Sequence, residues 1–392
     1  LEEFLHGLPL VGNQAGSAME AFKAGVREFL QPPSFFEALG SRYIGPFDGH
    51  NIEEMEHAFH NAIELSEEGP IVVHVLTQKG RGYAPAENDS VKNMHDTSAV
   101  KVGSYTEAFT ESLIKLAEEH DELVAMTAAM PDSTGLLPFR ERFPDRTYDV
   151  GIAEQHAVTA AAGMAMGGLR PVVAVYSTFM SRAFDQVNLD VGLHRQPVIF
   201  CLDRAGVTGD DGASHHGLLD MVLFTKVPGM TVFAPSSYQE LQAQLIDAVE
   251  LCTAGPTMIR WSKQSAPSIS EAEVGSGLSA RKARSGSDVC IIGVGQMLAA
   301  AHEAADLLAT KGVSASVWDP RVIRPIDPAM VADAASHRLV VSIEDGLRDG
   351  GAGDGFRDAI ESFLETNSDP HGACKVRVLG MPTLFVPHDR PE

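Results

Sequence analysis

Asp149-Val150-Gly151-Ile152-Ala153-Glu154-Gln155-His156 is the stretch that decides the fold, because an extended apolar segment turns here into a helix of very small residues, Ala157 to Gly168. An acidic side chain in a first helical turn is ordinarily explained by its favourable interaction with the helix dipole. The motifs on either side of this stretch favour a ligand site instead.

One motif precedes the Glu154 stretch and three follow it. They are Thr127-Ala128-Ala129-Met130-Pro131-Asp132, then Tyr176-Ser177-Thr178-Phe179-Met180-Ser181-Arg182, Asp203-Arg204-Ala205-Gly206 and Gly209-Asp210-Asp211-Gly212-Ala213-Ser214-His215-His216-Gly217. In this order and spacing they resemble the pyrimidine-binding domain of thiamine-diphosphate enzymes of the transketolase-like family, most closely the 1-deoxy-D-xylulose-5-phosphate synthases.

The resemblance extends along nearly the whole chain. The segments 43–50 and 79–87 resemble the end of that family's first domain, and the segment 345–356 resembles its third domain. The resemblance implies an α/β fold of the transketolase type, with a parallel-sheet pyrimidine-binding domain and a transketolase C-terminal-type domain.

Hydrophobic patterning gives the same organisation. We expect the C-terminal part of a diphosphate-binding first domain at 1–95, the pyrimidine-binding domain at 104–265, and the C-terminal-type domain at 280–392. Alternation of short β-branched runs with helical segments predicts parallel sheets with helices on both faces. Polar stretches at 88–103 and 266–287 are interpreted as linkers.

Composition restricts the partners and the compartment. The 392 residues suffice for two or three domains, and the net charge of −23 argues against nucleic acid and anionic membrane surfaces as partners. Four widely spaced cysteines, no signal peptide and no membrane-spanning run favour a cytoplasmic protein. The chain starts without methionine and in mid-pattern, so we expect it to be part of a longer protein.

The resemblance implies condensation of pyruvate with D-glyceraldehyde 3-phosphate, with loss of CO₂, to give 1-deoxy-D-xylulose 5-phosphate. It also implies a homodimer. The cofactors would be thiamine diphosphate and Mg²⁺, with the metal ligands in a segment upstream of Leu1, because the family's Gly-Asp-Gly motif followed by Asn is not found at that place here. The sequence Gly353-Asp354-Gly355 lacks the asparagine and is interpreted as a strand-to-helix turn, so we expect no metal site in this chain.

Glu154 occupies the family position of the carboxyl group that hydrogen-bonds a ring nitrogen of the cofactor's aminopyrimidine. A carboxyl group held in this position takes part in general acid–base catalysis. Phe179 matches the aromatic ring that stacks on the pyrimidine, and Tyr83 matches a tyrosine that reaches the cofactor from the first domain. His95 matches a histidine that approaches the cofactor, and we include it among the catalytic candidates.

Arginine is suited to a sugar phosphate, because its planar fork matches phosphate oxygens and remains charged. The resemblance assigns this role to Arg182, Arg204 and Arg260, although Lys263 replaces a second family arginine near Arg260. His215 is the candidate for proton transfer to substrate oxygens, since its ordinary pKa is near neutral. Two further residues are candidate substrate contacts: Tyr176, and Asp211, which could instead orient His215.

Two alternatives remain open. A transketolase, or the partner-type subunit of a 2-oxoacid dehydrogenase, would share the same pair of domains. A non-catalytic fragment that only dimerises would explain the missing diphosphate motif but not the retained Glu154 and arginines.

Overall fold

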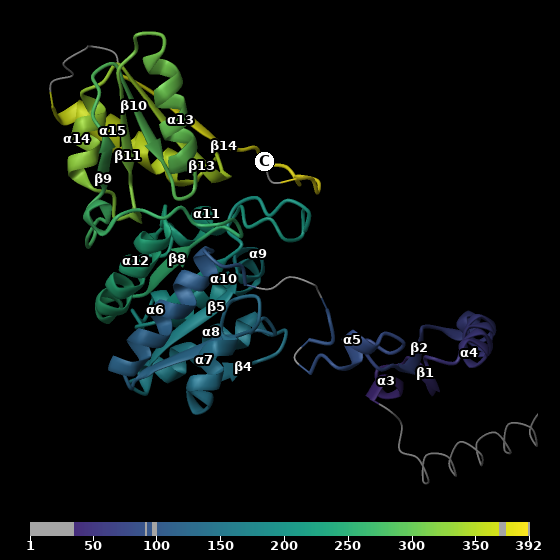
Figure 1. Ribbon diagram of the computed structural model, residues 1–392. Coiled ribbons are helices and arrows are strands. Elements are labelled where there is room, and N and C mark those ends of the chain that lie inside the picture. Colours follow the sequence, from purple (N-terminus) through teal and green to yellow (C-terminus); the bar gives the residue numbers. More distant parts are fainter. Residues whose placement is uncertain (1–34, 91, 96–99, 368–373, 391–392) are drawn as a thin grey trace, which may run out of the picture. The chain divides into compact units, whose positions relative to one another are not determined.

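The computed structural model describes residues 35–90, 92–95, 100–367 and 374–390. The chain divides into two compact units, residues 1–97 and 98–392 (Figure 1). The helical spacing of Met19, Phe22, Val26 and Phe29 lies outside the described residues.

In the first unit, a helix connects two parallel strands. Strand β1 (Arg42–Asp48) pairs with β2 (Ile71–Leu76), and helix α4 (Ile52–Leu65) lies between them along the chain. The side chain of Asn51 caps α4 by accepting a hydrogen bond from the amide of Glu54. The sequence accounts for both elements, because Ile52, Met55, Phe59 and Ile63 recur at helical spacing and 71–76 is a short run rich in β-branched residues. Two short helices, α3 (Phe35–Ala38) and α5 (Ala84–Glu87), flank this motif.

The second unit begins with a seven-stranded sheet in the order β12-β7-β8-β6-β5-β3-β4. All its neighbouring strands are parallel except β12, which is antiparallel to β7. The strands are β3 (Leu123–Thr127), β4 (Thr147–Asp149), β5 (Arg170–Tyr176), β6 (Ile199–Asp203), β7 (Thr231–Phe233), β8 (Thr257–Arg260) and β12 (Val322–Arg324). The helices are α6 (Tyr105–Glu119), α7 (Leu137–Arg142), α8 (Glu154–Met166), α9 (Ser177–Met180), α10 (Phe184–Gln186), the π-helix η4 (Val187–Gly192), α11 (Asp220–Phe224) and α12 (Tyr238–Leu251).

Successive side chains of the central strands point to opposite faces of the sheet, and both sets are apolar, which explains why both faces carry helices. Val173 and Val175 of β5 pack in one cluster with apolar residues of α8, η4 and α11. Val172 and Ala174 point the other way and pack with residues of α6, α7 and α12. A strand buried on both faces is typical of a parallel sheet between two helical layers, as the sequence predicts.

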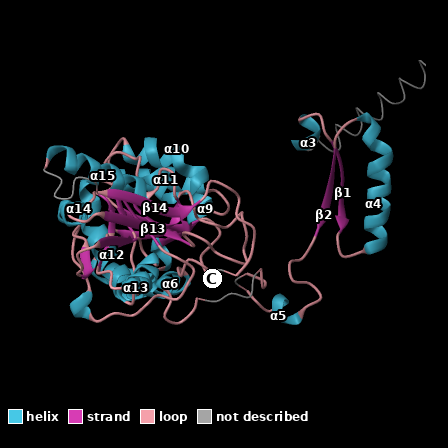
Figure 2. Cartoon of the chain, turned by 90° about the horizontal axis from the view of Figure 1, so that it is seen from above, coloured by secondary structure: helices cyan, strands magenta, loops and turns pink. Residues whose placement is uncertain are grey.

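The chain then forms a five-stranded sheet in the order β14-β13-β10-β11-β9 (Figures 1 and 2). Its strands are β9 (Arg281–Arg284), β10 (Val289–Gly293), β11 (Ala315–Asp319), β13 (Leu339–Leu347) and β14 (Lys375–Met381). Its helices are α13 (Met297–Ala309), α14 (Pro328–Ala335) and α15 (Ala352–Thr366). One buried cluster includes residues of both sheets, such as Phe200 and Val340, so the two halves of this unit share a core.

The composition of the stretch 266–287 suggested a linker, but the stretch also contains regular structure. It contains the antiparallel edge strand β9 and a single 3-10 turn at Glu271–Glu273. In addition, β12 comes from the C-terminal half of the chain but joins the sheet of the preceding half. Local composition does not reveal a strand that pairs with a partner so distant in the sequence.

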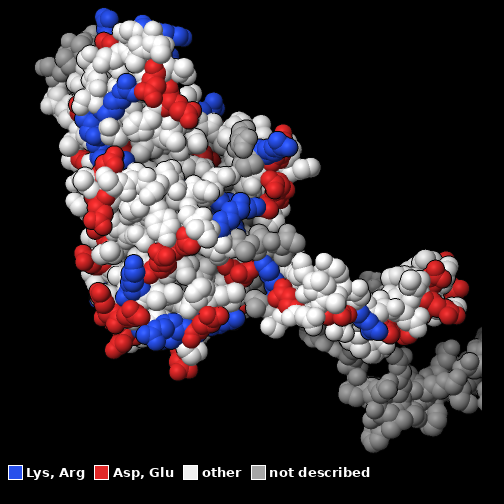
Figure 3. Space-filling view, viewed as in Figure 1, with Lys and Arg blue, Asp and Glu red and all other residues white. Residues whose placement is uncertain are grey.

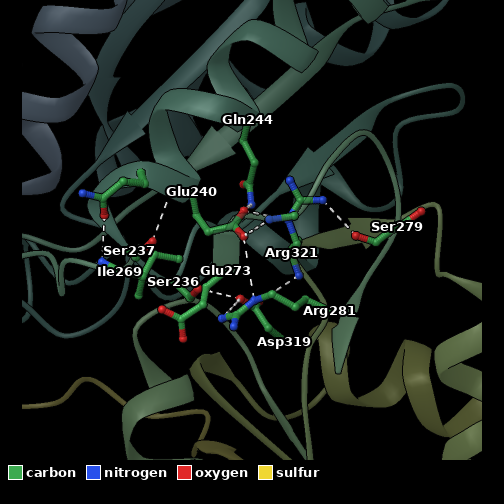
Figure 4. A network of polar contacts seen from close by, with 12 residues as sticks. Ser236, Ser237, Glu240, Gln244, Ile269, Glu273, Ser279, Arg281, Asp319 and Arg321 are labelled. Atoms are coloured by element: carbon green, nitrogen blue, oxygen red, sulfur yellow. Dashed lines mark hydrogen bonds and ion pairs between the residues drawn. The ribbon is translucent and has the colours of Figure 1, made fainter. Parts of the chain in front are cut away.

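A buried ionic network fixes the junction between the two halves (Figure 4). Arg321, which is fully buried, donates from Nε to Oε2 of Glu240 on α12 at 2.6 Å and from one terminal nitrogen to the carbonyls of Gly277 and Ser279. Arg281 lies 3.3 Å from Asp319, whose carboxylate also accepts from the hydroxyl of Ser236. The network therefore holds the stretch between the sheets against both of them.

Acidic and basic side chains are interspersed on the face of the molecule in Figure 3. Within the described residues, no helix combines the length and the apolarity needed to cross a membrane.

Candidate active site

The candidate residues of the second unit follow strands β4, β5, β6 and β8 of the seven-stranded sheet. Tyr176, the last residue of β5, is paired in register with Asp203, the last residue of β6. Because parallel strands end at the same edge of a sheet, the segments after them meet there, where ligands bind in such folds.

Glu154 is the first residue of helix α8 and is only 2% exposed. Its Oε2 accepts a hydrogen bond from Arg182 at 3.1 Å, while the Arg182 side chain is half exposed. Within the part of the chain that the structure describes, no hydrogen bond reaches Oε1 of Glu154. The carboxylate is thus shielded from bulk water and retains one oxygen for a ligand.

Three rings gather beside the end of β5. The rings of Tyr176 and Phe179 stack with their centroids 5.7 Å apart, and His215 meets the Phe179 ring edge-on at 5.4 Å. Phe179 and Arg182 lie one turn apart, on α9 and the 3-10 turn that follows it. The aromatic cluster and the Glu154–Arg182 pair are therefore joined through a single turn of the chain.

Arg204 adds a guanidinium group to this cluster. It stacks over the Tyr176 ring at 4.5 Å, pairs with Asp203 at 2.8 Å and donates to the carbonyl of Ser133 at 2.5 Å. Burial lowers the pKa of Arg204, but the neighbouring Asp203, Tyr176 and Asp211 outweigh this effect and raise it above its ordinary value. The side chain keeps its charge and is 11% exposed.

Arg260, the last residue of β8, lies in a different environment from the one expected of a phosphate ligand. It is 3% exposed and donates to Asp220 and Asp345, each at 2.7 Å. Its remaining terminal nitrogen, Nη2, is buried and has no partner among the described residues. A phosphate could reach this guanidinium only if the contact between the two halves of the unit opened.

Asp211 does not orient His215 in this structure, contrary to one of our two expectations. Its Oδ2 pairs with Nζ of Lys263 at 2.6 Å, and Nδ1 of His215 instead faces the hydroxyl of Ser214 at 2.9 Å. The lysine that replaces the family arginine thus holds an acidic residue of the 206–217 segment.

Tyr83 and His95 belong to the first unit, where both side chains are exposed. Gly353-Asp354-Gly355 lies in the first turn of α15, directly after the turn from β13, in agreement with its interpretation as a strand-to-helix turn. No group of three or more histidine, cysteine or acidic side chains within the described ranges is arranged to hold a metal ion. A hollow of about 350 Å³ in the first unit, beside α4, contains none of the predicted residues.

Sequence reasoning did not single out Asp345 or Ser133, which contact two of the predicted arginines. A signal for the first was available in Gly206. A Cβ atom there would lie 2.3 Å from Oδ2 of Asp345, so a larger residue would displace that carboxylate, and the φ of +78° also favours glycine. The partner itself is too distant in the sequence to be identified from that glycine.

Comparison with known proteins gives matches along the chain. Residues 1–77 match the family model for 1-deoxy-D-xylulose-5-phosphate synthase, 102–268 the transketolase pyrimidine-binding domain, and 278–385 the transketolase C-terminal domain. The chain is 45% identical to a 1-deoxy-D-xylulose-5-phosphate synthase of Mycobacteroides abscessus and 42% identical to one of Thermobifida fusca. These matches cover 99% and 98% of this chain but 61% of each relative, so the chain spans about three fifths of their length.

Solved structures show the same fold. A split-gene transketolase described as an inactive beta4 tetramer superposes with a TM-score of 0.64 at 28% identity, over 72% of this chain and 90% of that one. A transketolase of Pichia stipitis in complex with sedoheptulose 7-phosphate gives a TM-score of 0.55 at 19% identity, over 62% of this chain and 38% of that one.

Proposed function

Because the chain carries the pyrimidine-binding and C-terminal domains of the transketolase family and is related along its length to the 1-deoxy-D-xylulose-5-phosphate synthases, we propose that it serves the reaction of those synthases. That reaction condenses pyruvate with D-glyceraldehyde 3-phosphate, releases CO₂ and yields 1-deoxy-D-xylulose 5-phosphate, a precursor of isoprenoids, thiamine and pyridoxal. The observation that carries the proposal is the buried Glu154 at the ligand-binding edge of the sheet, with one oxygen open.

The residues present fit the pyrimidine end of thiamine diphosphate. When bound, this cofactor supplies a carbon nucleophile and an electron sink for decarboxylation. Glu154 would hydrogen-bond a ring nitrogen through Oε1, since Oε2 is held by Arg182. The Phe179 ring would stack on the heterocycle, and Tyr83 and His95 are proposed to contribute from the first unit.

We propose that Arg204 and Arg182 bind the phosphate of the aldehyde substrate and that Arg260 holds the two halves of the unit together. Arg204 lies over the Tyr176 ring, which His215 also contacts, and its side chain is 11% exposed, whereas two carboxylates enclose Arg260. His215 is placed against Tyr176 and Phe179, where it would move a proton to or from a substrate oxygen, and Tyr176 and Asp211 would contact substrate.

The metal ligands are proposed to lie outside the described residues, since those residues offer no cluster for Mg²⁺. We propose the domain bounds 1–95, 104–265 and 280–392. We also place the protein in the cytoplasm, because Cys201, Cys252 and Cys290 are buried and form no disulfide, as is usual in reducing compartments.

We propose a homodimer because large apolar side chains are exposed on or directly beside α8 and η4. The two elements pack together, and Thr159 bonds Asp190 between them at 2.6 Å. The exposed side chains are Ile152, Met166, Leu189 and Leu193. A second copy of the chain would remove them from water. Sedimentation analysis should give a dimer for the intact protein and more monomer for Leu193→Asp.

The proposed reaction is tested with the intact protein, thiamine diphosphate, Mg²⁺ and labelled pyruvate. We expect CO₂ release that depends on glyceraldehyde 3-phosphate and formation of labelled 1-deoxy-D-xylulose 5-phosphate. Transfer of a two-carbon unit from a ketose phosphate, without pyruvate consumption, would instead identify a transketolase. Cofactor binding without either reaction would indicate a non-catalytic protein.

A further inference from the structure

The segment from Gly206 to Gly217 forms a closed loop beyond β6. Gly206 and Gly217 exchange two backbone hydrogen bonds, each 2.8 Å long, so the two ends of the loop are tied together. Within the loop, the amides of His215 and His216 bond to the carbonyl of Gly212. Asp211 and His215 lie on this loop, so its conformation determines where both side chains point.

The base of the loop is packed against the site. A Cβ atom at Gly217 would lie 2.5 Å from Oγ of Ser177 and 2.6 Å from the carbonyl oxygen of Arg204. These two residues belong to the segments that carry Phe179 and the candidate phosphate ligand. A change in the loop's closure would therefore reach the site directly.

His216 joins the two arms of the loop from inside. It is 6% exposed, and its Nδ1 lies 3.0 Å from both the backbone nitrogen and the Oγ1 of Thr208. A backbone N–H can only donate, so Nδ1 must be the acceptor and must carry no proton. The neutral ring then carries its proton on Nε2.

We propose that His216 is a positioning residue for the site: its unprotonated Nδ1 holds the buried amide of Thr208 and thereby fixes the loop that presents His215 to Tyr176 and Phe179. The consequence for catalysis rests on the proposed function, whereas the ordering of the loop does not. His216 acts through His215 and touches no substrate itself.

If His216 acts by accepting a hydrogen bond from Thr208, the position of the acceptor atom will matter. If His216 only fills space in the core, it will not. In asparagine, Oδ1 is attached to Cγ, as Nδ1 is in histidine, so it can accept from Thr208 at nearly the same point. Glutamine has the same amide one carbon farther out, and leucine has similar bulk but no acceptor. The three substitutions therefore separate acceptor position, acceptor chemistry and volume.

The test compares His216→Leu, His216→Gln and His216→Asn in the intact protein. Amide hydrogen exchange of the 206–217 segment should be roughly tenfold faster or more in the leucine and glutamine variants, because a lost buried bond opens the loop. It should stay within about threefold of wild type in the asparagine variant. Thr208→Val, which keeps the backbone N–H, should have a smaller effect than His216→Leu.

Turnover should follow the same order. His216→Leu and His216→Gln should lower kcat about tenfold or more with little change in the KM for pyruvate, and His216→Asn should restore kcat. Unchanged exchange in the leucine and glutamine variants, or an asparagine variant as impaired as they are, overturns the proposal. If His216→Leu does not fold, the matched asparagine and glutamine pair decides.

The exchange measurement needs no substrate, so failure of the two proposals can be told apart. A wild-type protein that makes no 1-deoxy-D-xylulose 5-phosphate overturns the proposed function and leaves the exchange result to decide the role of His216. If the wild type is active but His216→Leu exchanges its 206–217 amides at the wild-type rate, the proposed role of His216 is wrong and the proposed function stands.

Discussion

Arg204 and Arg260 stand at the ends of neighbouring strands of one sheet, yet they lie in opposite kinds of environment. Arg204 follows β6 and stacks on Tyr176, and its side chain is 11% exposed. Arg260 ends β8 and is enclosed by Asp220 and Asp345. The sequence motifs offered the same role for both residues.

The difference comes from elements that are distant in the sequence. Asp345 lies on β13 of the C-terminal half and reaches Arg260 across the junction, while the carboxylate partner of Arg204 is its own neighbour, Asp203. A buried guanidinium between two carboxylates is neutralised and holds structure together, whereas a partly exposed one beside aromatic rings remains available to an anion. The sheet edge is therefore divided into an open site and a closed junction.

The largest effect is expected at the open site. Glu154→Ala in the intact protein should lower turnover at least about hundredfold, because a positioned acid–base group contributes on the order of 10²–10⁴. The variant should remain folded, since the half-exposed Arg182 is the only partner of the Glu154 carboxylate among the described residues. A rate above about a tenth of wild type, measured with saturating cofactor, would remove Glu154 from the mechanism.

The closed junction should respond in stability instead. Arg260→Ala leaves two buried carboxylates without their cation and should lower the free energy of unfolding by about 3–5 kcal/mol. Denaturant titration checks this value, and Arg204→Ala is the matched control that should cost less. If Arg260→Ala is as stable as wild type but raises the KM for glyceraldehyde 3-phosphate, the division into site and junction is wrong.

Arg204→Ala should mainly weaken substrate binding. Loss of a charge-assisted hydrogen bond to a phosphate costs about 1.5–3 kcal/mol, so the KM for glyceraldehyde 3-phosphate should rise roughly 10- to 100-fold. The KM for pyruvate should change far less, because pyruvate has no phosphate. Equal changes in both constants would mean that Arg204 supports the fold.

The last expected effect is a pH dependence of stability at Glu344, beside the junction. Burial raises the pKa of Glu344, which precedes Asp345, to about 7 from an ordinary value of 4.5. The folded protein therefore binds more protons than the unfolded chain between these values, and the free energy of unfolding should fall as the pH rises from about 4.5 to 7.

This fall should amount to at most about 3 kcal/mol, because each unit of pKa difference corresponds to about 1.4 kcal/mol. Asp319, whose pKa burial raises to about 6, acts in the same direction, so Glu344→Gln serves as the comparison. The variant should lose part of the pH dependence. An identical pH profile for the two proteins would show that Glu344 titrates normally.

Much of this arrangement follows from local sequence. Small residues after Glu154 predicted helix α8, which begins at that residue. The apolar runs Val172–Val175 and Val198–Leu202 are typical of buried strands, and the structure has strands at Arg170–Tyr176 and Ile199–Asp203. These features depend on periodicity and on helix-start signals, which are encoded in neighbouring residues.

Three features that local sequence did not reveal depend on contacts between segments that are distant in the chain. Strand β12 joins the sheet of the other half, Lys263 pairs with Asp211, and Asp345 encloses Arg260. Each partner is chosen by the packing of the two halves, so neither composition nor spacing could identify it. The burial of Arg260 is a consequence of that packing.

A crystal structure of the intact protein with thiamine diphosphate would show most directly whether the part of the sheet edge around Glu154 holds the cofactor's pyrimidine. We predict that a ring nitrogen lies within hydrogen-bonding distance of Glu154 Oε1 and that the pyrimidine stacks on Phe179, while Arg260 remains paired with Asp220 and Asp345. A pyrimidine bound away from Glu154, or an Arg260 released to bind the ligand, would contradict it.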